Sequence, residues 1–397
     1  MKLVTRTGWW KWRFYLPDMK IRSIKQLKNL KNKRVLVRVD FNVPFEKGKV
    51  KDESRILASL STIQHLLKKG AKVILVSHLG RPEGYDKKLS LAPVAKRLGE
   101  LLKRKVDLLK IKKSEDCRVG AYCNTPLQML ENIRFFADEA KDKNNFSQKL
   151  AELAEIFVLD GFAVAHRDSG SVTGVVKYLP SYAGLLLEKE IVGLSKVIEK
   201  PKKPLVVVLG GAKVETKAPV LKNLLPKADY VLIGGGIFNT YLKAIGYQVC
   251  GSLVDDDYLK LVKQYCGKMK VIKPVDVIVG THDGRDYKVM KINNKFKISD
   301  KRYAILDIGP ETVRLYAQYI KKAQTLVWNG AMGYFEQKPY DYGTLAIARL
   351  VASRSKGKAF GVIGGGETLQ AMEMVKMGED VDLVSTGGGA MLEFLAG

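Results

Sequence analysis

Residues suited to binding phosphate follow several short apolar segments of this sequence, and they differ between its two halves. In the first half, basic and polar residues follow these segments, at 40–44, 78–82 and 166–167. Arginine holds small, highly anionic ligands through paired hydrogen bonds. In the second half, the stretches that follow are glycine-rich, at 210–217, 234–236, 329–336 and 364–367. Because glycine lets backbone N–H groups at helix N-termini approach phosphates, the combination favours phosphoryl transfer between a small acid and a nucleotide.

The apolar segments that precede these residues are predicted to be strands. They are short and rich in β-branched residues, and they lie at 34–39, 72–77, 156–159, 205–209, 230–233, 325–328 and 360–363. Apolar residues with helical spacing lie between them, as at 57–67, 91–102 and 313–320. Such alternation indicates parallel sheets covered on both faces, with ligands bound beyond the carboxyl ends of the strands. We therefore predict an α/β protein with two doubly wound, Rossmann-like parallel-sheet domains joined by a hinge helix.

A single predicted helix at 182–200 divides the chain nearly in half. Prolines flank it, at Pro180, Pro201 and Pro204, which is typical of a connector, or of a hinge if the halves move. We predict an N-terminal domain at 19–181, a C-terminal domain at 201–384, and a C-terminal segment near the hinge at 385–397. Residues 1–18 match no α/β pattern, and Met19 is an alternative start. This extension is a start assigned too far upstream, a cloning artefact, or a native basic and aromatic arm.

Composition narrows the class of protein. The 68 lysines and arginines exceed the 41 acidic residues, which gives a net charge of +27. That charge fits either a solvated, lysine-rich surface or an attraction for polyanions such as phosphorylated metabolites or nucleic acid. No apolar run approaches the roughly 18 residues of a membrane span. The four cysteines, Cys117 and Cys123 among them, form no CxxC pair. We therefore expect a cytoplasmic protein with free thiols and no membrane association.

Common nucleotide and metal motifs are absent from the sequence. There is no G-x-x-x-x-G-K-[S/T] loop, which argues against a P-loop NTPase. No G-x-G-x-x-G follows a strand with an acidic residue about 20 positions later, which argues against a dinucleotide dehydrogenase. The four histidines lack zinc-ligand spacing. We therefore expect none of these three kinds of site.

From about Leu27 to the end of the chain, the loops and their order resemble the phosphoglycerate kinase family. The most specific matches are at 38–44, 77–82, 131–135, 210–217, 307–310, 328–336 and 385–389. The resemblance implies a two-domain hinge enzyme that transfers phosphate reversibly between ATP and 3-phosphoglycerate, giving ADP and 1,3-bisphosphoglycerate. It also implies a monomeric, cytoplasmic protein with no obligatory nucleic-acid partner.

The resemblance implies roles for individual residues on the phosphoglycerate side. Asp40 and Asn42 match the residues that bind the hydroxyl and carboxylate end of the substrate. The cationic cup around the substrate would consist of Arg55, His78, Arg81, Arg134 and Arg167. Of these, Arg55 resembles the arginine that the family places against the transferring phosphoryl group.

On the nucleotide side, Lys213 and Lys217 resemble the lysines that reach the same phosphoryl group, and they share one face of a predicted helix. Glu336 resembles the carboxylate that accepts the ribose hydroxyls, and Glu367 the ligand of the Mg²⁺ bound with ATP or ADP. The other implied nucleotide-binding residues are Gly211, Gly234, Gly235, Asn329, Gly333, Gly364, Gly365, Gly366 and Thr368. The catalytic residues would be Arg55, Lys213 and Lys217, acting together when the cleft closes.

Three features depart from the family pattern. Glu367 stands where the family has aspartate, and Ala331 stands where it has proline. The chain stops at Gly397, where the family usually continues with a segment that packs on the N-terminal domain. These departures leave open a catalytically weak nucleotide-binding homologue. The basic surface leaves open nucleic-acid binding as a side activity.

Overall fold

The computed structural model describes residues 21–46, 48–109, 125–142 and 145–397. Expectations about the extension at 1–18 and about the thiols of Cys117 and Cys123 lie outside the described residues. The chain divides into two compact units, Met1–Ile191 and Val192–Gly397. In the described ranges, no helix combines the length and the apolar character needed to cross a membrane.

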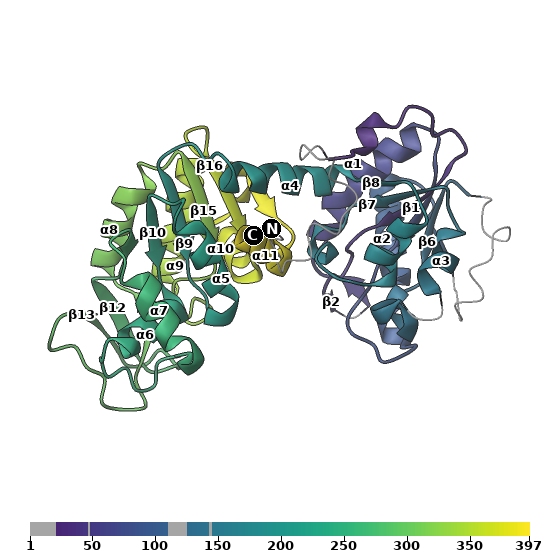
Figure 1. Ribbon diagram of the computed structural model, residues 1–397. Helices are drawn as coiled ribbons and strands as arrows, with labels where there is room; N and C mark the ends of the chain where they lie inside the picture. The colour runs from purple at the N-terminus through teal and green to yellow at the C-terminus, as the bar shows by residue number, and fades with distance from the viewer. Residues whose placement is uncertain (1–20, 47, 110–124, 143–144) are drawn as a thin grey trace, which may run out of the picture. The chain divides into compact units, whose positions relative to one another are not determined.

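The N-terminal unit is built on one six-stranded sheet in which all neighbouring strands are parallel (Figure 1). In sheet order the strands are β5 (Asp107–Leu109), β6 (Leu127–Leu130), β4 (Lys72–Val76), β1 (Arg34–Arg38), β7 (Ile156–Leu159) and β8 (Ser181–Ala183). Its other elements include α1 (Ser54–Lys68), α2 (Ala92–Leu102), α3 (Phe146–Ala151), the hairpin of β2 (Phe45–Glu46) and β3 (Lys49–Val50), and several short 3₁₀ and π turns. Because β1 lies between β4 and β7, the loops after these three strands emerge side by side.

Burial explains why the central strands form. Val35 and Val37 of β1 pack in one apolar cluster with Ile63 and Leu66 of α1. Leu36, which points to the opposite face of the strand, is fully buried as well. Both faces of the sheet are therefore covered, and this is why β1 reads as a continuous apolar run in the sequence.

The C-terminal unit holds a second parallel six-stranded sheet (Figure 1). In sheet order the strands are β11 (Val271–Ile272), β10 (Tyr230–Ile233), β9 (Leu205–Leu209), β15 (Thr325–Asn329), β16 (Phe360–Gly364) and β17 (Leu383–Ser385). Its helices are α5 (Val214–Leu224), α6 (Gly235–Ala244), α7 (Leu259–Cys266), α8 (Pro310–Ile320), α9 (Tyr342–Ser355), α10 (Gly366–Val375) and α11 (Gly388–Ala396). The strand order reverses between β9 and β15, and ligands of such sheets bind at this switch point.

A small antiparallel sheet, which the sequence did not predict, completes the C-terminal unit. Its strand order is β13 (Tyr287–Lys291), β12 (Asp276–Gly280) and β14 (Ala304–Ile308). Strands β12 and β14 are buried, whereas β13 is largely exposed. Strand β14 carries Asp307 next to the loop after β15, where a Cβ at Gly333 would lie 2.5 Å from Asp307 Oδ1.

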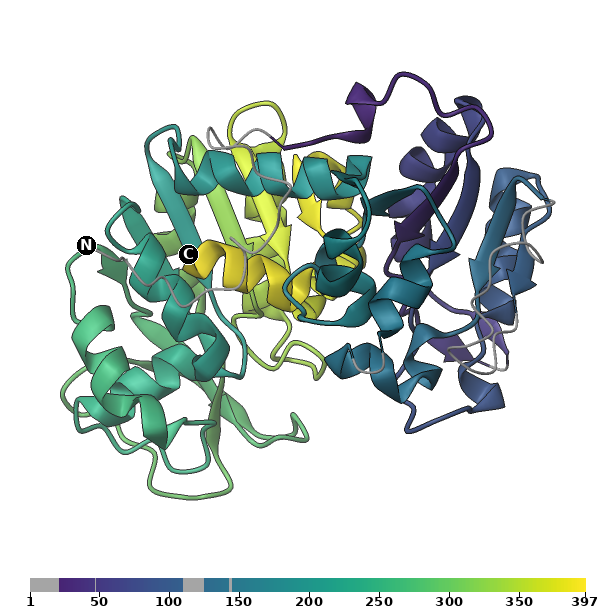
Figure 2. The same cartoon turned by 45° about the vertical axis from the view of Figure 1, so that its right-hand side comes forward.

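The predicted α/β class with two parallel sheets is confirmed, and all seven predicted strands are present with ends within one residue. The start of the predicted helix at 182–200 is wrong. Ser181–Ala183 instead form β8, which pairs with β7, and the helix is α4 (Leu185–Ile198). The boundary between the two units falls within α4. At the C-terminus, α11, yellow in Figure 2, packs against α5, and the Asn223 side chain donates to the Leu395 carbonyl at 2.6 Å.

Asp160, which directly follows β7, joins α1 to the start of α4. Its Oδ1 accepts hydrogen bonds from the Thr62 hydroxyl at 2.7 Å and from the Leu186 N–H at 3.0 Å. Burial raises the pKa of this carboxyl from 3.8 to about 6. The folded protein therefore holds the proton more tightly than the unfolded chain does, so ionisation of Asp160 lowers stability as the pH rises through this interval.

We expect the free energy of unfolding of the Asp160→Asn variant to increase relative to that of the unsubstituted protein as the pH rises. The expected change in this difference is up to about 3 kcal/mol at neutral pH. The amide keeps an acceptor for Thr62 and Leu186 and removes the ionisation. Denaturant unfolding of both proteins at about pH 4.5 and about pH 7.5 measures this change. A stability difference that does not vary with pH would contradict the expectation.

Candidate functional site

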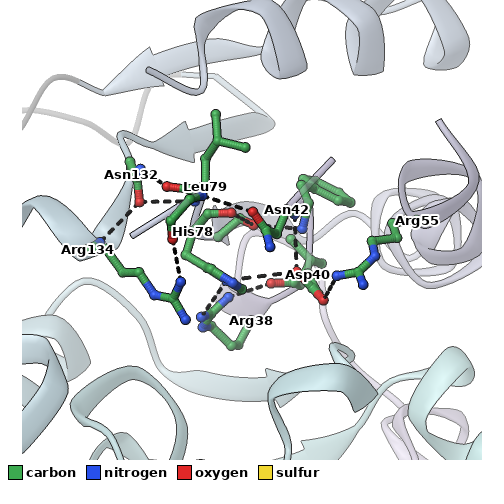
Figure 3. Close-up of polar contacts among 12 residues, drawn as sticks. Arg38, Asp40, Asn42, Arg55, His78, Leu79, Asn132 and Arg134 are labelled. Atoms are coloured by element: carbon green, nitrogen blue, oxygen red, sulfur yellow. Dashed lines mark hydrogen bonds and ion pairs between the residues drawn. The ribbon is translucent and has the colours of Figure 1, made fainter. Parts of the chain in front are cut away.

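In the N-terminal unit, the predicted acid-binding residues lie at the carboxyl ends of neighbouring strands (Figure 3). Asp40 and Asn42 follow β1, and His78 follows β4. Arg134 lies in a 3₁₀ turn, Ile133–Phe135, shortly after β6. Of the three remaining predicted residues of this group, Arg81 and Arg167 follow β4 and β7 and are exposed, and Arg55 lies in the first turn of α1.

Arg38, the last residue of β1, lies at the centre of a buried polar array (Figure 3). Its side chain is only 2% exposed, and its Nη2 donates to His78 Nδ1 at 3.3 Å. Asp40 Oδ1 lies 3.8 Å from the same ring nitrogen, and Asp40 Oδ2 forms an ion pair with Arg55 from the first turn of α1. Arg55, Asp40, His78 and Arg38 therefore form one contiguous group.

Burial, and after it the neighbouring charges, shift the pKa values of these residues. Burial and the nearby arginines strongly lower the pKa of His78, so its ring is neutral. Burial and the same crowding of cations lower the pKa of Arg134 to about 10, and burial lowers the pKa of Arg38. His78 therefore does not supply the positive charge that its place in a cationic cup implied. The arginines supply that charge, and an anionic ligand would relieve their mutual repulsion.

The arginines open onto a pocket of about 530 Å³. Arg38, Arg81, Arg134 and Arg167 line it, whereas Asp40, Asn42, His78 and Arg55 do not. Asn42 instead fixes the loop after β4, because its Oδ1 accepts the Gly80 N–H at 2.9 Å. The structure thus divides the predicted residues into two groups, one lining the pocket and one outside its lining, and Arg38 contacts the second group through His78.

In the C-terminal unit, backbone contacts join the loops at the switch point between β9 and β15. The Gly210 N–H donates to the Asn329 carbonyl at 3.0 Å, and the Gly211 N–H donates to the Ala331 carbonyl at 2.6 Å. Gly330 adopts φ +90°, and a Cβ there would lie 2.4 Å from the Gly210 carbonyl oxygen. A side chain at either loop would separate them, so glycine is required for this approach.

Lys217 is the buried cation of these loops. Its side chain, 8% exposed, donates to Asn329 Oδ1, and the Asn329 amide donates to the Gly364 carbonyl at 2.6 Å. Burial lowers the pKa of Lys217, and the negative charge of Glu367 opposes that shift. Lys213 differs: it is exposed and immediately precedes α5. The two lysines expected to act alike from one helix face therefore have different environments.

Glu367 and Thr368, at the start of α10, contact the loop after β15. Glu367 Oε2 accepts the Ala331 N–H at 3.2 Å, and Thr368 Oγ1 accepts the Gly330 N–H at 2.7 Å. Proline has no N–H, so the family's proline at position 331 could not make the first of these bonds. The two residues that depart from the family pattern, Ala331 and Glu367, are therefore hydrogen-bonded to each other.

A second pocket, of about 360 Å³, adjoins these loops. Its walls are largely apolar and include Phe238, Leu253, Val277, Ile305 and Met332. The predicted residues that line it are Gly211, Gly235, Gly333, Glu336 and Glu367. Gly234, Asn329, Gly364 and Thr368 are buried at or next to the ends of the adjoining strands and helices, Gly365 is half-buried, and Gly366 is exposed at the start of α10. A planar base would fit between such apolar walls, with phosphates near the glycines.

The donor set suits a magnesium ion that is bound with a nucleotide. Among the described residues, no group of three or more His, Cys, Asp or Glu side chains could hold a metal. Glu367 offers a single carboxylate beside the glycine loops. Mg²⁺ is commonly held by one or two carboxylates together with substrate phosphates and waters, so the residues present fit this group.

Three functional candidates were missed from the sequence. Arg38 stood within a matched motif but was not singled out, although it lines the arginine pocket. Glu139 is a buried acid in the same pocket. Asp307 is fully enclosed, accepts the Gly343 N–H at 2.6 Å, and lines the second pocket. Arg38 and Asp307 both had a usable signal, since they belong to the matched stretches at 38–44 and 307–310, whereas Glu139 had none.

Comparison with known proteins agrees with this geometry. A family model described as phosphoglycerate kinase matches residues 24–397. A phosphoglycerate kinase of Borreliella burgdorferi is 41% identical over 392 residues, covering 96% of this chain and 97% of that protein. The one from Moorella thermoacetica is 44% identical over 385 residues, covering 94% and 96%.

Solved structures agree as well. The phosphoglycerate kinase of Coxiella burnetii matches with a TM-score of 0.83 and 40% identity, covering 94% of this chain and 96% of that one. The enzyme of Pyrococcus horikoshii matches with a TM-score of 0.81 and 31% identity, covering 95% and 96%. With its two parallel sheets, its arginine pocket and its glycine loops, the chain belongs to the phosphoglycerate kinase family.

Proposed function

We propose that this chain transfers a phosphoryl group reversibly between 1,3-bisphosphoglycerate with ADP and 3-phosphoglycerate with ATP. The relatives named phosphoglycerate kinase support this activity, which is that of a phosphotransferase with a carboxyl acceptor. The observation that carries the proposal is the pairing of two unlike sites in one chain. One is a pocket lined by four arginines, and the other is an apolar pocket beside glycine loops and a buried lysine.

On the acid side, the arginines bind a small and highly anionic molecule. Arg81, Arg134 and Arg167 line the pocket and form paired hydrogen bonds to carboxylate and phosphate oxygens. Asp40 and Asn42 match the family residues that orient the hydroxyl and carboxylate end, and they take this role here although neither lines the pocket. Arg55, held by Asp40 in this structure, turns toward the transferring phosphoryl group.

On the nucleotide side, the base enters the apolar pocket and Glu336 accepts the ribose hydroxyls. The glycine loops receive the phosphates, and Lys217 Nζ reaches the group being transferred. Lys213, exposed before α5, binds the same group from the solvent side. Mg²⁺ held by Glu367 and the nucleotide phosphates would neutralise part of their charge.

The reaction needs little covalent help from the protein. A carboxylate oxygen of 3-phosphoglycerate bonds to the γ-phosphorus of ATP, and the bond from that phosphorus to the bridging oxygen breaks, releasing ADP. No proton moves, so no general base is required. In-line positioning of the substrates, together with charge neutralisation by Arg55 and Lys217, accounts for the acceleration of phosphoryl transfer. We infer that bending about α4 brings the bound substrates together and excludes water, in a monomeric, cytoplasmic enzyme.

A coupled assay with ATP, Mg²⁺ and 3-phosphoglycerate tests this function, with Mn²⁺ replacing Mg²⁺ in a parallel series. We expect robust turnover that EDTA abolishes. Protein that binds ADP but turns over with neither metal would instead be a catalytically weak homologue. Nucleic-acid affinity that persists while turnover is absent would favour the basic surface as the functional site.

We expect Glu367→Gln to raise the Mg²⁺ concentration needed for half-maximal activity by about tenfold or more. The amide can still accept the Ala331 N–H, so the loop is preserved while the negative charge is lost. Glu373→Gln, in the same helix and exposed, is the matched control. An unchanged metal requirement in Glu367→Gln would exclude this side chain as the metal carboxylate.

A further inference from the structure

Glu139 is an acid buried within a pocket that is otherwise basic. Its side chain is 5% exposed, and it lines the same pocket as Arg38, Arg81, Arg134 and Arg167. A carboxylate there repels an anionic ligand, and burial makes its ionised form costly. Its presence therefore needs a cause other than direct contact with the substrate.

Both carboxylate oxygens of Glu139 are engaged by one turn. Oε1 accepts the Ser171 hydroxyl at 2.6 Å and the Ser169 hydroxyl at 2.9 Å, and Oε2 accepts the Ser171 N–H at 2.8 Å. The turn is a single π-helical turn, Gly170–Gly174, a form frequently found at functional sites. Gly170 leaves no room for a side chain, because a Cβ there would lie 2.7 Å from the Phe146 ring. These hydrogen bonds therefore fix the orientation of the Glu139 carboxylate relative to this turn.

The Ser171 hydroxyl connects Glu139 to Arg38 by hydrogen bonds. A hydroxyl has one proton, and the Ser171 proton goes to Glu139, so Ser171 Oγ accepts from Arg38 Nε, 2.9 Å away. Arg38 has only donors, so at its other end it donates Nη2–H to His78 Nδ1. Because Nδ1 accepts, the proton of the neutral His78 ring lies on Nε2. A single directed chain therefore runs from Glu139 through Ser171 and Arg38 to His78.

We propose that Glu139 is a positioning residue: through Ser171 it holds Arg38, and through Arg38 it fixes the Nε2–H form of His78 for binding the acidic substrate. This inference rests on the proposed function. The carboxylate balances Arg38, the most enclosed of the four described arginines that line the pocket, and the ligand meets Arg81, Arg134 and Arg167, which are more exposed.

Three substitutions test the chain of contacts. Glu139→Gln removes the charge, Ser171→Ala removes the relay but keeps the charge, and Glu139→Asp is the conservative variant. The matched control is Ser147→Ala: Ser147 is as buried as Ser171 and donates to Asp142 at 2.9 Å beside the same turn, without contact to Arg38. Calorimetric titration with 3-phosphoglycerate and, separately, with ADP measures binding without turnover.

We expect Glu139→Gln and Ser171→Ala to weaken 3-phosphoglycerate binding by about tenfold, the loss expected for one hydrogen bond to a charged group. ADP affinity should stay unchanged, Glu139→Asp should recover part of the loss, and Ser147→Ala should bind as the unsubstituted protein does. Equal losses for both ligands, or the same loss in Ser147→Ala, would overturn the proposal in favour of a merely structural role.

A second readout does not depend on binding. Long-range ¹H–¹⁵N spectra of the histidine rings should show His78 protonated on Nε2 alone, and a mixture of both ring forms in Glu139→Gln and Ser171→Ala. An unchanged ring signal in both variants would overturn the proposal. Unsubstituted protein that binds no 3-phosphoglycerate would refute the proposed function, and the His78 signal would still decide the role of Glu139.

Discussion

Replacing Arg55 with alanine is expected to lower kcat by about 10³-fold, the scale associated with an arginine that stabilises a transferring phosphoryl group. ADP affinity should stay unchanged, because the apolar pocket and the glycine loops lie wholly in the C-terminal unit. Arg55 is suited to this role because its side chain is one-third exposed and is held by a single carboxylate, Asp40. Coupled kinetics and calorimetric titration with ADP measure the two quantities.

Arg97→Ala is the control for this substitution. Arg97 bonds to Glu53, which directly precedes α1, at 2.6 Å, so its loss perturbs the start of the helix that carries Arg55. It lies outside both pockets, and kcat should therefore be retained. A large loss of ADP affinity in Arg55→Ala, or a kcat equally reduced in Arg97→Ala, would contradict the assignment of Arg55.

Lys217→Met is expected to lower kcat by about 10²- to 10³-fold while leaving 3-phosphoglycerate affinity unchanged. Methionine is similar in length and apolar, so it should fill the buried site without the charge. Lys217 is the cation that lies among the glycine loops, bonded to Asn329 and within the field of Glu367. Steady-state kinetics and titration with the acid substrate check both parts.

Lys222→Met, in the same helix but exposed, is the matched substitution for Lys217. It removes the same charge from α5 and should leave kcat within experimental error of the unsubstituted protein. If the two variants lost activity to the same extent, the effect would come from helix α5 or from net charge, and Lys217 would have no direct role in the transfer.

Strand β6 (Leu-Gln-Met-Leu) is buried yet was not predicted, since it has no β-branched residue. The other seven inner strands of the two parallel sheets could be predicted because each is buried on both faces. Such strands appear in the sequence as uninterrupted β-branched runs, as in Leu205–Leu209, where every residue is buried. Short edge strands give no such pattern: β5, β8 and β17 have three residues each and β11 has two. Strand β13 was missed for another reason, since its exposed Tyr-Lys-Val-Met-Lys segment has only one face to pack.

For the site, the residue types and the strand ends were predictable, but the local environments were not. Lys213 and Lys217 look equivalent in the sequence, yet only Lys217 is enclosed by the loops after β9 and β15. His78 was expected to be cationic, yet burial among arginines makes it neutral. Glu139 gave no sequence signal, because its partners Ser169 and Ser171 are about thirty positions away in the chain. Such effects depend on contacts between distant segments, which periodicity does not report.

The apolar cluster around β1 and α1 in the N-terminal unit shares no residue with the cluster around β15 and α9 in the C-terminal unit. A chain with two independent cores can melt in two steps, each with its own heat absorption. A small molecule that binds one folded half raises the melting temperature of that half through mass action. Calorimetric melting curves recorded with the acid alone and with the nucleotide alone would therefore assign each ligand to its half without a probe or a substitution.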